Sequence, residues 1–365
     1  MTLAFDCRYT RIGRHDGISR YTAGIVTELA KLTDVTMIIS DERQLEMLPD
    51  LPWVKVSGPT SVREPLVALQ VNKLKPDVVI TPMQTMGTFG RRYPLALTVH
   101  DLIYYSNPTP PRDLPGFVRL LWRLYHKAWW PQRMLLNGAD AVVTVSDTTR
   151  DLIAEHHLTT KPVVVARNAA DLPDSGLAAA AAGDAPARAA SKSLVYMGSF
   201  MPYKNVETLV RAVGELPGYT LHLLSKASDA DKARLRAIDP DARIEFHDGV
   251  SDEEYHALLQ HATALVTASL DEGFGIPLVE SMGFGTPVVV SDIAVFREIG
   301  GEAALYAPAK DAAAFARAVK RLEDPGEWAA RSRVSRTQAE QFSWTASARV
   351  IAELASGLSG RSPRR

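Results

Sequence analysis

The chain has 365 residues, of which 46% are hydrophobic and 23% charged, and its formal net charge is -1. That length suits two domains, and the near-neutral charge gives no reason to expect a nucleic-acid partner. The single cysteine, Cys7, excludes an intrachain disulfide and a cysteine-based zinc site. The chain lacks the start of a signal peptide, and no run reaches the roughly 18 apolar residues of a spanning helix. We therefore expect a cytoplasmic protein.

The first half of the chain alternates short apolar runs, rich in Val and Ile, with segments of helical period. Such runs are typical of parallel strands that are buried on both faces. The expected strands are 3–7, 35–40, 78–81, 96–100, 141–146 and 163–167, and the expected helices are 17–31, 63–74, 117–137 and 147–157. The alternation predicts a doubly wound, Rossmann-like α/β domain over residues 1–173.

Residues 174–192 interrupt this alternation. They are mostly Ala with Gly, Ser and Pro, which indicates a linker, although an Ala-rich stretch is also compatible with a helix. The alternation then resumes, with strands expected at 194–197, 220–224, 243–246, 264–267 and 287–290 and helices at 205–216, 230–238, 252–261, 277–283 and 312–322. This predicts a second Rossmann-like domain over 193–343, facing the first across a cleft. Helices near 327–341 and 344–358 come after the last expected strand, and we expect 344–365 to pack on the first domain.

Several catalytic signatures are absent from the sequence. No Gly-x-Gly-x-x-Gly follows the first strand, and no phosphate-binding Gly-x-x-x-x-Gly-Lys-Ser/Thr occurs, which disfavours dinucleotide-dependent dehydrogenases and P-loop enzymes. Asp229 and Asp231 have a spacing that can hold a metal bridging a diphosphate. They open an expected helix, however, where acidic residues are favoured by the helix dipole alone. We therefore expect no metal site.

The most informative segment is 269–291, which follows an expected buried strand. Gly273 and Gly275 permit backbone conformations and close ligand approach that a side chain would block. Pro277 favours a helix start at that point, and the free N–H groups of such a start can bind a diphosphate. The segment therefore indicates an anion site beside a buried strand.

Two carboxylates bracket this helix start, Glu272 in the loop and Glu280 in the first helical turn. Because Gly and Pro exclude one continuous helix through both, the loop can turn both carboxylates into one pocket. There they would accept hydrogen bonds from sugar and ribose hydroxyls. The alternative interpretation is a Gly-rich turn with two solvated glutamates.

The same segment resembles the nucleotide-sugar segment of glycosyltransferase family 4. The resemblance rests on the spacing of Glu272 and Glu280, the Gly-Thr-Pro-Val-Val that follows, and the stretch Arg297-Glu-Ile-Gly-Gly-Glu. Other stretches that agree in order are Gly17-Ile-Ser-Arg-Tyr, Thr98-Val-His-Asp-Leu, Ala139-Asp-Ala-Val-Val-Thr-Val-Ser, Asn168, Tyr196-Met-Gly-Ser and Lys204-Asn205. The resemblance implies the GT-B fold of two facing Rossmann-like domains. It also implies sugar transfer with retention of configuration and without a bound metal.

Residue roles follow from the resemblance alone. It places Glu272 against donor-sugar hydroxyls, Glu280 against the ribose, and the Lys204 ammonium against the departing diphosphate. His100, at the end of a strand, would lie beside the donor sugar, so the implied catalytic residues are His100, Lys204 and Glu272. The implied donor-binding positions are Gly17, Ser199, Lys204, Val250, Glu272, Gly273, Phe274, Gly275, Ile276 and Glu280.

The sequence departs from the family pattern at the phosphate cradle. Ser199 occupies the position where the family commonly has an arginine, so Arg14 or Arg297 would have to supply a second phosphate cation. Gly17 resembles the glycine loop that approaches phosphate and acceptor. The alternative interpretation of this stretch is structural: Asp16, the residue before Gly17, would simply cap the N-terminus of the helix. Val250 matches the loop that lies beside the nucleotide base.

Among relatives, these motif versions resemble bacterial mannosyltransferases of polysaccharide and glycolipid assembly. We therefore expect GDP-mannose as donor in preference to a UDP-sugar, a glycan or lipid-linked acceptor, and no other cofactor. The mechanism implied is front-face attack, in which the donor phosphate takes the acceptor proton. Two alternatives stay open: a sugar-phosphate synthase or phosphorylase on the same fold, and a non-catalytic nucleotide-sugar-binding protein.

Residues 116–138 carry four basic and no acidic side chains, interleaved with aromatic ones: Arg119, Arg123, Lys127 and Arg133 with Phe117, Trp122, Tyr125, Trp129 and Trp130. A basic, aromatic helix can lie on an anionic membrane surface, which would suit a lipid-linked acceptor. The other interpretation is a helix that covers the sheet, with its aromatic side chains in the core and its basic ones solvated.

Overall fold

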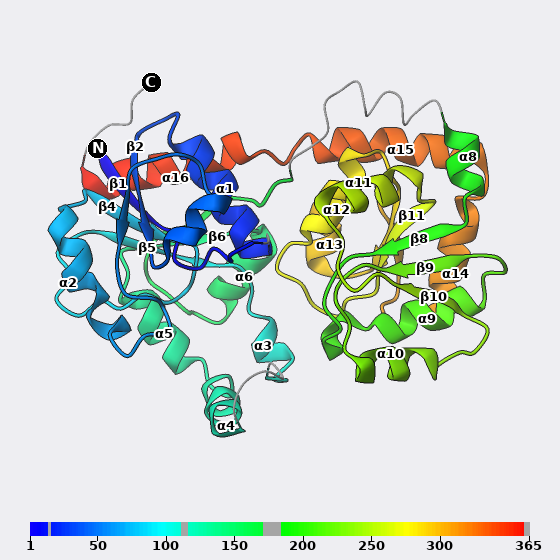
Figure 1. The fold of residues 1–365 in the computed structure, drawn as a ribbon, viewed down its shortest axis with the longest axis horizontal. Helices are drawn as coiled ribbons and strands as arrows, with labels where there is room; N and C mark the ends of the chain where they lie inside the picture. The colour runs from blue at the N-terminus through cyan, green and yellow to red at the C-terminus, as the bar shows by residue number, and fades with distance from the viewer. Residues whose placement is uncertain (14–15, 111–115, 171–183, 361–365) are drawn as a thin grey trace. The chain divides into compact units, whose positions relative to one another are not determined.

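The computed structural model describes residues 1–13, 16–110, 116–170 and 184–360. The chain divides into two compact units, residues 1–169 together with 343–365, and residues 170–342. Each unit is built on one sheet whose strands are all parallel, with helices connecting successive strands (Figure 1). The prediction of two doubly wound α/β domains is confirmed.

The first unit contains a seven-stranded sheet in the order β3-β2-β1-β4-β5-β6-β7. Its strands are β1 Thr2–Asp6, β2 Asp34–Ile39, β3 Trp53–Lys55, β4 Val78–Thr81, β5 Leu95–Val99, β6 Ala141–Thr144 and β7 Val163–Val165. Every residue of β4, β5 and β6 is buried, which explains why each strand is apolar apart from one threonine. The strand order reverses between β1 and β4.

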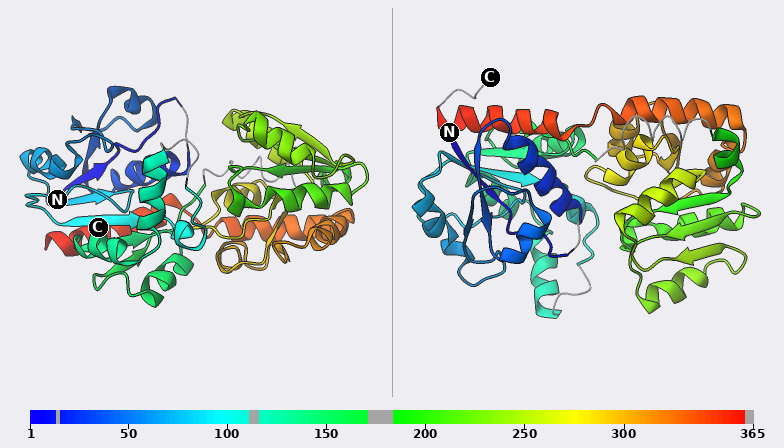
Figure 2. Two further views of the ribbon diagram at one scale, coloured as in Figure 1. Left: turned by 90° about the horizontal axis from the view of Figure 1, so that it is seen from below. Right: turned by 45° about the horizontal axis from the view of Figure 1, so that its top comes forward.

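Helices cover this sheet and position its loops. They are α1 Gly17–Leu29, η1 Glu42–Met47, η2 Glu64–Leu66, α2 Val67–Val71, η3 Asn72–Leu74, α3 Ile103–Ser106, α4 Gly116–Tyr125, α5 Trp130–Asn137, α6 Asp147–Glu155 and α16 Trp344–Ser359. The last of these, α16, returns from the end of the chain to pack against α1 (Figures 1 and 2). The ring of Trp344 lies so close to Gly24 of α1 that an added Cβ there would lie 2.6 Å from it. The close packing of α16 on α1 therefore requires a glycine at this position.

Two helix predictions in this unit need correction. The single helix expected over 117–137 is two helices, α4 and α5, because Pro131 lies in the first turn of α5. A proline is accommodated there, whereas inside a longer helix it would remove a hydrogen bond and clash with the preceding turn. The helix expected over 63–74 is a short α-helix between two 3-10 turns, which ends at Lys75 in the left-handed conformation (φ 48°).

The second unit contains a six-stranded sheet in the order β10-β9-β8-β11-β12-β13. Its strands are β8 Ser193–Tyr196, β9 Thr220–Leu223, β10 Arg243–Phe246, β11 Ala264–Thr267, β12 Val288–Ser291 and β13 Leu305–Ala307. Its helices are α8 Ala185–Ala190, η4 Pro202–Lys204, α9 Val206–Gly214, α10 Asp229–Arg236, α11 Asp252–His261, α12 Ile276–Gly283, α13 Ala294–Gly300, α14 Ala312–Arg321 and α15 Pro325–Ala339. The strand order reverses between β8 and β11.

Part of the segment expected to be a linker is helical. Helix α8 packs on the second unit through Arg188, whose side chain is 2% exposed. Its guanidinium donates to the carbonyl of Leu259 (2.9 Å) and lies over the ring of Trp328, 4.5 Å from the ring centroid. The Ala-rich composition thus gives a docked helix at its C-terminal end, while residues 171–183 lie outside the described ranges.

Candidate active site

The second unit brings two loops together where its strand order reverses. Strands β8 and β11 are neighbours at this point, and the chain leaves them in opposite directions along the sheet. In doubly wound sheets, ligands bind outside the carboxyl ends of the strands at such a reversal. The two loops contact each other here: the Leu270 N–H donates to the Tyr203 carbonyl (2.7 Å), and the Asn205 amide donates to the Ala268 carbonyl (3.0 Å). The fold therefore places residues 197–205 and 268–275 at its expected ligand position.

Lys204 and Glu272 meet in these two loops. The ammonium Nζ lies 2.5 Å from the carboxylate Oε1, and the Ser269 hydroxyl donates to the same oxygen (2.8 Å). The side chains of Lys204 and Glu272 are only 17% and 12% exposed. Two of the three residues to which the resemblance gives a catalytic role thus form one largely desolvated ion pair, although 68 positions separate them in the sequence.

Helix α12 begins directly after this pair. Its N-cap is Gly275, with a φ of 97°, and an added Cβ would lie 3.0 Å from the Phe296 ring. Glycine is therefore required here for both the backbone conformation and the space. Gly275 has no side chain with which to cap the helix, Pro277 has no N–H, and the Leu278 N–H donates to the Gly275 carbonyl (2.9 Å). Within the described residues, the Ile276 N–H is thus the first-turn donor left for another acceptor. The first turn includes Pro277, as predicted, but the helix starts one residue earlier, so Glu280 lies in its second turn.

The other residues of this segment point into the unit. Glu280 is 6% exposed, and its Oε2 accepts a hydrogen bond from the Tyr255 hydroxyl (3.0 Å). Phe274 is 3% exposed and packs edge-on against Phe342, with 5.6 Å between ring centroids. Gly273 is buried as well. The Phe274 side chain therefore packs inside the unit, and the solvated-glutamate interpretation is wrong for Glu280.

Arg297 and Arg14 are the two candidates for a second cation that would contact the donor phosphate. The Arg297 guanidinium makes two hydrogen bonds to Asp292 (2.7 and 2.8 Å) and covers the Tyr306 ring, so its charge is already paired. Arg14 lies outside the described residues. Ser199 is exposed, and its backbone carbonyl accepts from the Tyr196 hydroxyl (2.7 Å). The contact of Ser199 with the donor stays a prediction.

Val250 follows two residues in the left-handed region, Asp248 (φ 57°) and Gly249 (φ 104°), and is half-buried. Its place beside a base also stays a prediction.

In the first unit, His100 directly follows β5. Its Nε2 lies 2.7 Å from the Pro82 carbonyl, and because a carbonyl can only accept, Nε2 carries the hydrogen. The neutral ring then presents Nδ1 as an acceptor. Burial lowers the pKa of His100, although the Pro82 carbonyl raises it. The ring also makes an edge contact with Tyr21, with 5.0 Å between ring centroids. His100 is therefore a neutral, oriented imidazole at the carboxyl end of its strand.

His100 lines a pocket of about 310 Å³ in the first unit. The sequence analysis did not identify the other polar and aromatic side chains of this pocket, which include Gln84, Asp101, Tyr104, Tyr105 and His126. A signal was available, because Gln84 follows β4 and Asp101 and Tyr104 follow β5, both at carboxyl ends. The pocket can accommodate a small molecule that offers hydroxyl groups and an apolar face.

Two more predicted positions belong to this unit. Gly17 is the first residue of α1, and Asp16 caps that helix by accepting from the Ser19 N–H (2.9 Å). The capping interpretation of Asp16 is thus confirmed, and an approach of Gly17 to a phosphate stays a prediction. Asn168 is 5% exposed, and its Oδ1 makes no hydrogen bond within the described part of the chain.

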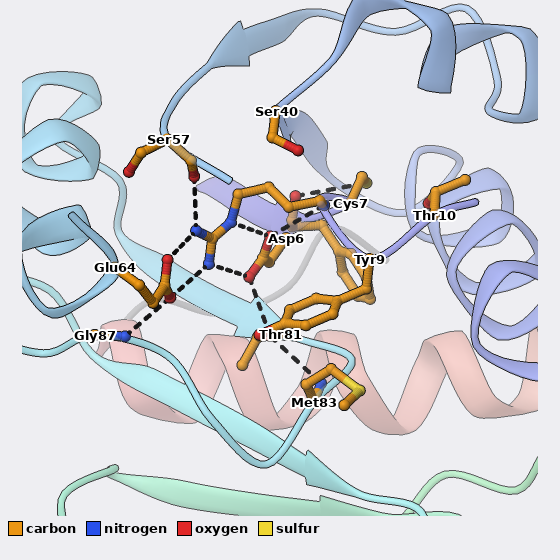
Figure 3. Close-up of polar contacts among 12 residues, drawn as sticks. Asp6, Cys7, Tyr9, Thr10, Ser40, Ser57, Glu64, Thr81, Met83 and Gly87 are labelled. Atoms are coloured by element: carbon orange, nitrogen blue, oxygen red, sulfur yellow. Dashed lines mark hydrogen bonds and ion pairs between the residues drawn. The ribbon is translucent and has the colours of Figure 1, made fainter. Parts of the chain in front are cut away.

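The reversal in the first sheet, between β1 and β4, contains a buried ion-pair network that the sequence analysis missed (Figure 3). The Arg8 guanidinium makes two hydrogen bonds to Asp6 (2.8 and 2.9 Å) and two to Glu64 (2.6 and 3.1 Å). Glu64 in turn accepts from the Gly87 N–H (3.2 Å), and Asp6 accepts from the Thr81 hydroxyl (3.2 Å). The network ties the loop after β4 to the end of β1 and so fixes one wall of the pocket.

A segment of each unit matches a known protein family. Residues 15–173 match the model described as Glycosyltransferase Family 4, and residues 191–324 match the model described as Glycosyl transferases group 1. The chain belongs to glycosyltransferase family 4. Among the residues described for this family 4 enzyme, no helix is long and apolar enough to cross a membrane.

One relative and two solved structures are similar to this family 4 enzyme over most of its length. It is 25% identical to the O-antigen chain mannosyltransferase RfbU of Salmonella typhimurium over 86% of this chain and 89% of that one. Its fold matches sucrose-phosphate synthase from Thermosynechococcus elongatus (TM-score 0.73, 21% identity, 99% and 100% coverage). It also matches Anabaena HepE in complex with UDP and glucose (TM-score 0.71, 18% identity, 98% and 100% coverage). The two structures establish the GT-B fold.

Proposed function

We propose that this glycosyltransferase moves a hexose, with mannose favoured over glucose, from a nucleotide-diphosphate sugar to an acceptor hydroxyl, with retention of configuration. The observation that carries the proposal is the desolvated pair of Lys204 and Glu272 beside the uncapped start of α12. A cation, a carboxylate and the Ile276 N–H at the helix start match the three parts of such a donor: leaving diphosphate, sugar hydroxyls and remaining phosphate oxygens.

The donor would lie across the ends of β8 and β11. Its diphosphate would accept from the Ile276 N–H at the start of α12 and from the Lys204 ammonium. The sugar hydroxyls would donate to Glu272. The buried Glu280 would hold the ribose together with its neighbour Tyr255. GDP-mannose is favoured because the similar RfbU is named a mannosyltransferase.

The reaction breaks the bond between the anomeric carbon and the diphosphate oxygen. The acceptor oxygen forms a new bond on the same face, and its proton passes to the departing phosphate. The Lys204 ammonium stabilises the charge that develops on that phosphate, which is how a fixed cation in a water-poor site accelerates leaving-group departure. Lys204 would replace a metal in this role, so added Mg²⁺ should not raise turnover.

We further propose the pocket beside His100 as the acceptor site. Its aromatic side chains can pack on the apolar face of a sugar ring, and the free Nδ1 of His100 can accept from an acceptor hydroxyl.

Donor screening tests the proposal directly. GDP-mannose should raise the thermal midpoint more than UDP-glucose or an ADP-sugar, because a ligand that binds only the native state stabilises it. Hydrolysis or transfer should then release GDP, and the anomeric proton of the product should report retention. Transfer to inorganic phosphate or a sugar phosphate instead would favour a phosphorylase or synthase. Binding with neither hydrolysis nor transfer would favour a non-catalytic protein.

A peripheral membrane contact through α4 and α5 is also proposed, since these helices expose unusually many large apolar side chains. Five of them are between 54% and 64% exposed: Leu120, Leu121, Leu124, Trp130 and Met134. Basic side chains that are also exposed lie among them, namely Arg123, Lys127 and Arg133. The aromatic side chains are partly used inside the unit, because Trp129 stacks on Tyr105 with 3.8 Å between centroids. The apolar and basic mixture suits an anionic lipid surface.

Sedimentation with liposomes tests this contact. We expect the protein to pellet with anionic vesicles at low salt and less with neutral ones. The double variant Leu121→Ser and Leu124→Ser should lose this binding. Val62→Ser should retain it, because Val62 is 97% exposed but lies outside both helices. No pelleting of the unaltered protein at low salt would refute the membrane contact.

A further inference from the structure

A second cluster of chemically active side chains lies on the other side of β8 from the donor site. Strands β9 and β10 are paired in parallel, with His222 directly opposite Glu245. His247 comes two residues after Glu245, so strand alternation places both on the same face. The sheet order puts these residues on β9 and the edge strand β10, whereas Glu272 follows β11. Three potential metal ligands therefore converge at a place that the transfer reaction does not use.

We propose that His222, Glu245 and His247 bind a transition-metal dication of the Zn²⁺ type. The Nδ1 of His222 lies 3.1 Å from the Nε2 of His247 and 3.4 Å from Glu245 Oε2, and His247 Nε2 lies 3.7 Å from Glu245 Oε1. With Zn–N and Zn–O bonds of about 2.0–2.2 Å, neighbouring ligand atoms in a tetrahedral site lie about 3.3–3.6 Å apart. The two imidazole nitrogens are close to this spacing, and each lies near a different oxygen of the Glu245 carboxylate. One ligand atom from each of the three side chains lies within 4.8 Å of the other two, so a small adjustment would close the site around an ion.

The ligand types also fit. Two imidazole nitrogens and one carboxylate oxygen are a common set for Zn²⁺, whereas Mg²⁺ prefers oxygen ligands throughout. Glu245 is 57% exposed, so an ion can enter and water can complete the coordination.

Without an ion, the two imidazoles are held by a single N–H···N hydrogen bond at 3.1 Å. That bond uses one lone pair and leaves the Glu245 carboxylate beside the two imidazole rings. A dication would instead take a lone pair from each ring and offset the carboxylate charge. It would also join the edge strand β10 to β9 and fix His247 at the start of the loop that leads to Val250. The site would thus stabilise the second unit at its sheet edge.

The test uses the full-length, untagged chain, first dialysed against a chelator and then into metal-free buffer. Zn²⁺ is titrated in competition with a chromophoric chelator. We expect one Zn²⁺ to bind per chain, with a dissociation constant in the micromolar range or below, and no competition from Mg²⁺. His222→Gln and His247→Gln should each weaken binding at least tenfold. Co²⁺ should give the intense visible bands of a four-coordinate complex, and these should be lost in both variants.

His261→Gln is the matched control, because His261 is an exposed histidine at the end of α11. It should bind Zn²⁺ as the unaltered chain does, and Zn²⁺ should raise the thermal midpoint of both. Circular dichroism establishes whether each variant is folded, and Glu245→Gln replaces any that is not. Binding weaker than about 100 μM, or equal binding by the His222 and His247 variants, would overturn the proposal. Both readouts are independent of sugar transfer, so failure of the proposed transferase activity would leave them unaffected.

Discussion

The substitution Glu272→Gln isolates the carboxylate charge at the donor site. Glutamine keeps the size of the side chain and one acceptor oxygen, but it removes the negative charge that Lys204 and Ser269 contact. A hydrogen bond to a charged group contributes about 1.5–3 kcal/mol. If one such bond to a donor-sugar hydroxyl acts in the transition state, its loss lowers kcat about 10- to 150-fold, since about 1.4 kcal/mol corresponds to a factor of ten.

The same variant should have a limited effect on stability. Removing one partner of a fully buried ion pair costs about 3–5 kcal/mol. Here both side chains keep some exposure, 17% for Lys204 and 12% for Glu272, and glutamine still offers an acceptor. We therefore expect a loss of about 1–2 kcal/mol, which corresponds to a fall in Tm of about 2–8 °C. At 25 °C the variant should be folded, and nucleoside diphosphate binding should survive.

The assay measures product release at saturating donor, with nucleotide binding measured by calorimetry on the same samples. Glu280→Ala should behave differently, because the buried Glu280 is assigned to the ribose and its loss should weaken nucleotide binding as well as transfer. Glu215→Gln is the matched control, since Glu215 is exposed at the end of α9. Unchanged turnover in Glu272→Gln, with the control also unchanged, would remove Glu272 from the mechanism.

The remaining predictions address the cation, the helix start and the imidazole. Lys204→Met should lower kcat by about 10²- to 10³-fold, as the loss of one preorganised charge-stabilising donor does. The control Lys320→Met, at the exposed end of α14, should leave kcat unchanged. If Lys204→Met turned over as fast as the control, Lys204 would have no role at the leaving group. In chemical denaturation, Gly275→Ala should lower the unfolding free energy by about 1–3 kcal/mol, because the φ of 97° and the Phe296 ring both oppose a Cβ at this position. Gly357→Ala should leave the unfolding free energy unchanged or raise it, because an added Cβ at Gly357 would have nothing within 4 Å. Because burial lowers the pKa of His100 in the folded state, the unfolded state takes up its proton first as the pH falls. The contribution of neutral, buried His100 to the unfolding free energy is fully present above the ordinary histidine pKa. It is lost as the pH falls through the lower pKa of the folded state, by at most about 1.4 kcal/mol per pH unit. His100→Gln should therefore lose less stability than the unaltered chain between pH 7.5 and 5.5, and parallel denaturation curves would contradict this.

The strands that the sequence predicts best are those buried on both faces. The runs at 78–81 and 264–267 coincide with β4 and β11, because a central parallel strand is buried on both faces and is therefore mostly apolar. The edge strands β3 and β13 were missed. Each has three residues, and in β3 these are exposed or half-exposed, so neither length nor apolar pattern distinguishes them from a loop. Local pattern thus reports burial more reliably than it reports strand pairing.

The contacts of the site depend on sheet order, which local pattern does not contain. Lys204 and Glu272 meet because β8 pairs with β11 and not with β12, and this choice follows from how the intervening helices fill both faces. The resemblance supplied a role for each residue but no contact between them. The pocket residue His126 was missed for the same reason, since its loop joins the ends of β4 and β5 only in the folded first unit.

The ion pair itself suggests why the site would select a complete donor. In the structure, Lys204 and Glu272 satisfy each other, and separating them leaves two poorly solvated charges, which is costly. A diphosphate alone could replace Glu272 as the partner of Lys204, but it would leave the carboxylate with only Ser269. A sugar hydroxyl attached to that diphosphate would supply the missing hydrogen bond to Glu272. The diphosphate and the sugar of one donor would therefore bind more favourably together than either alone. The diphosphate pairs with Lys204, and the sugar hydroxyl pairs with the Glu272 carboxylate that Lys204 has left.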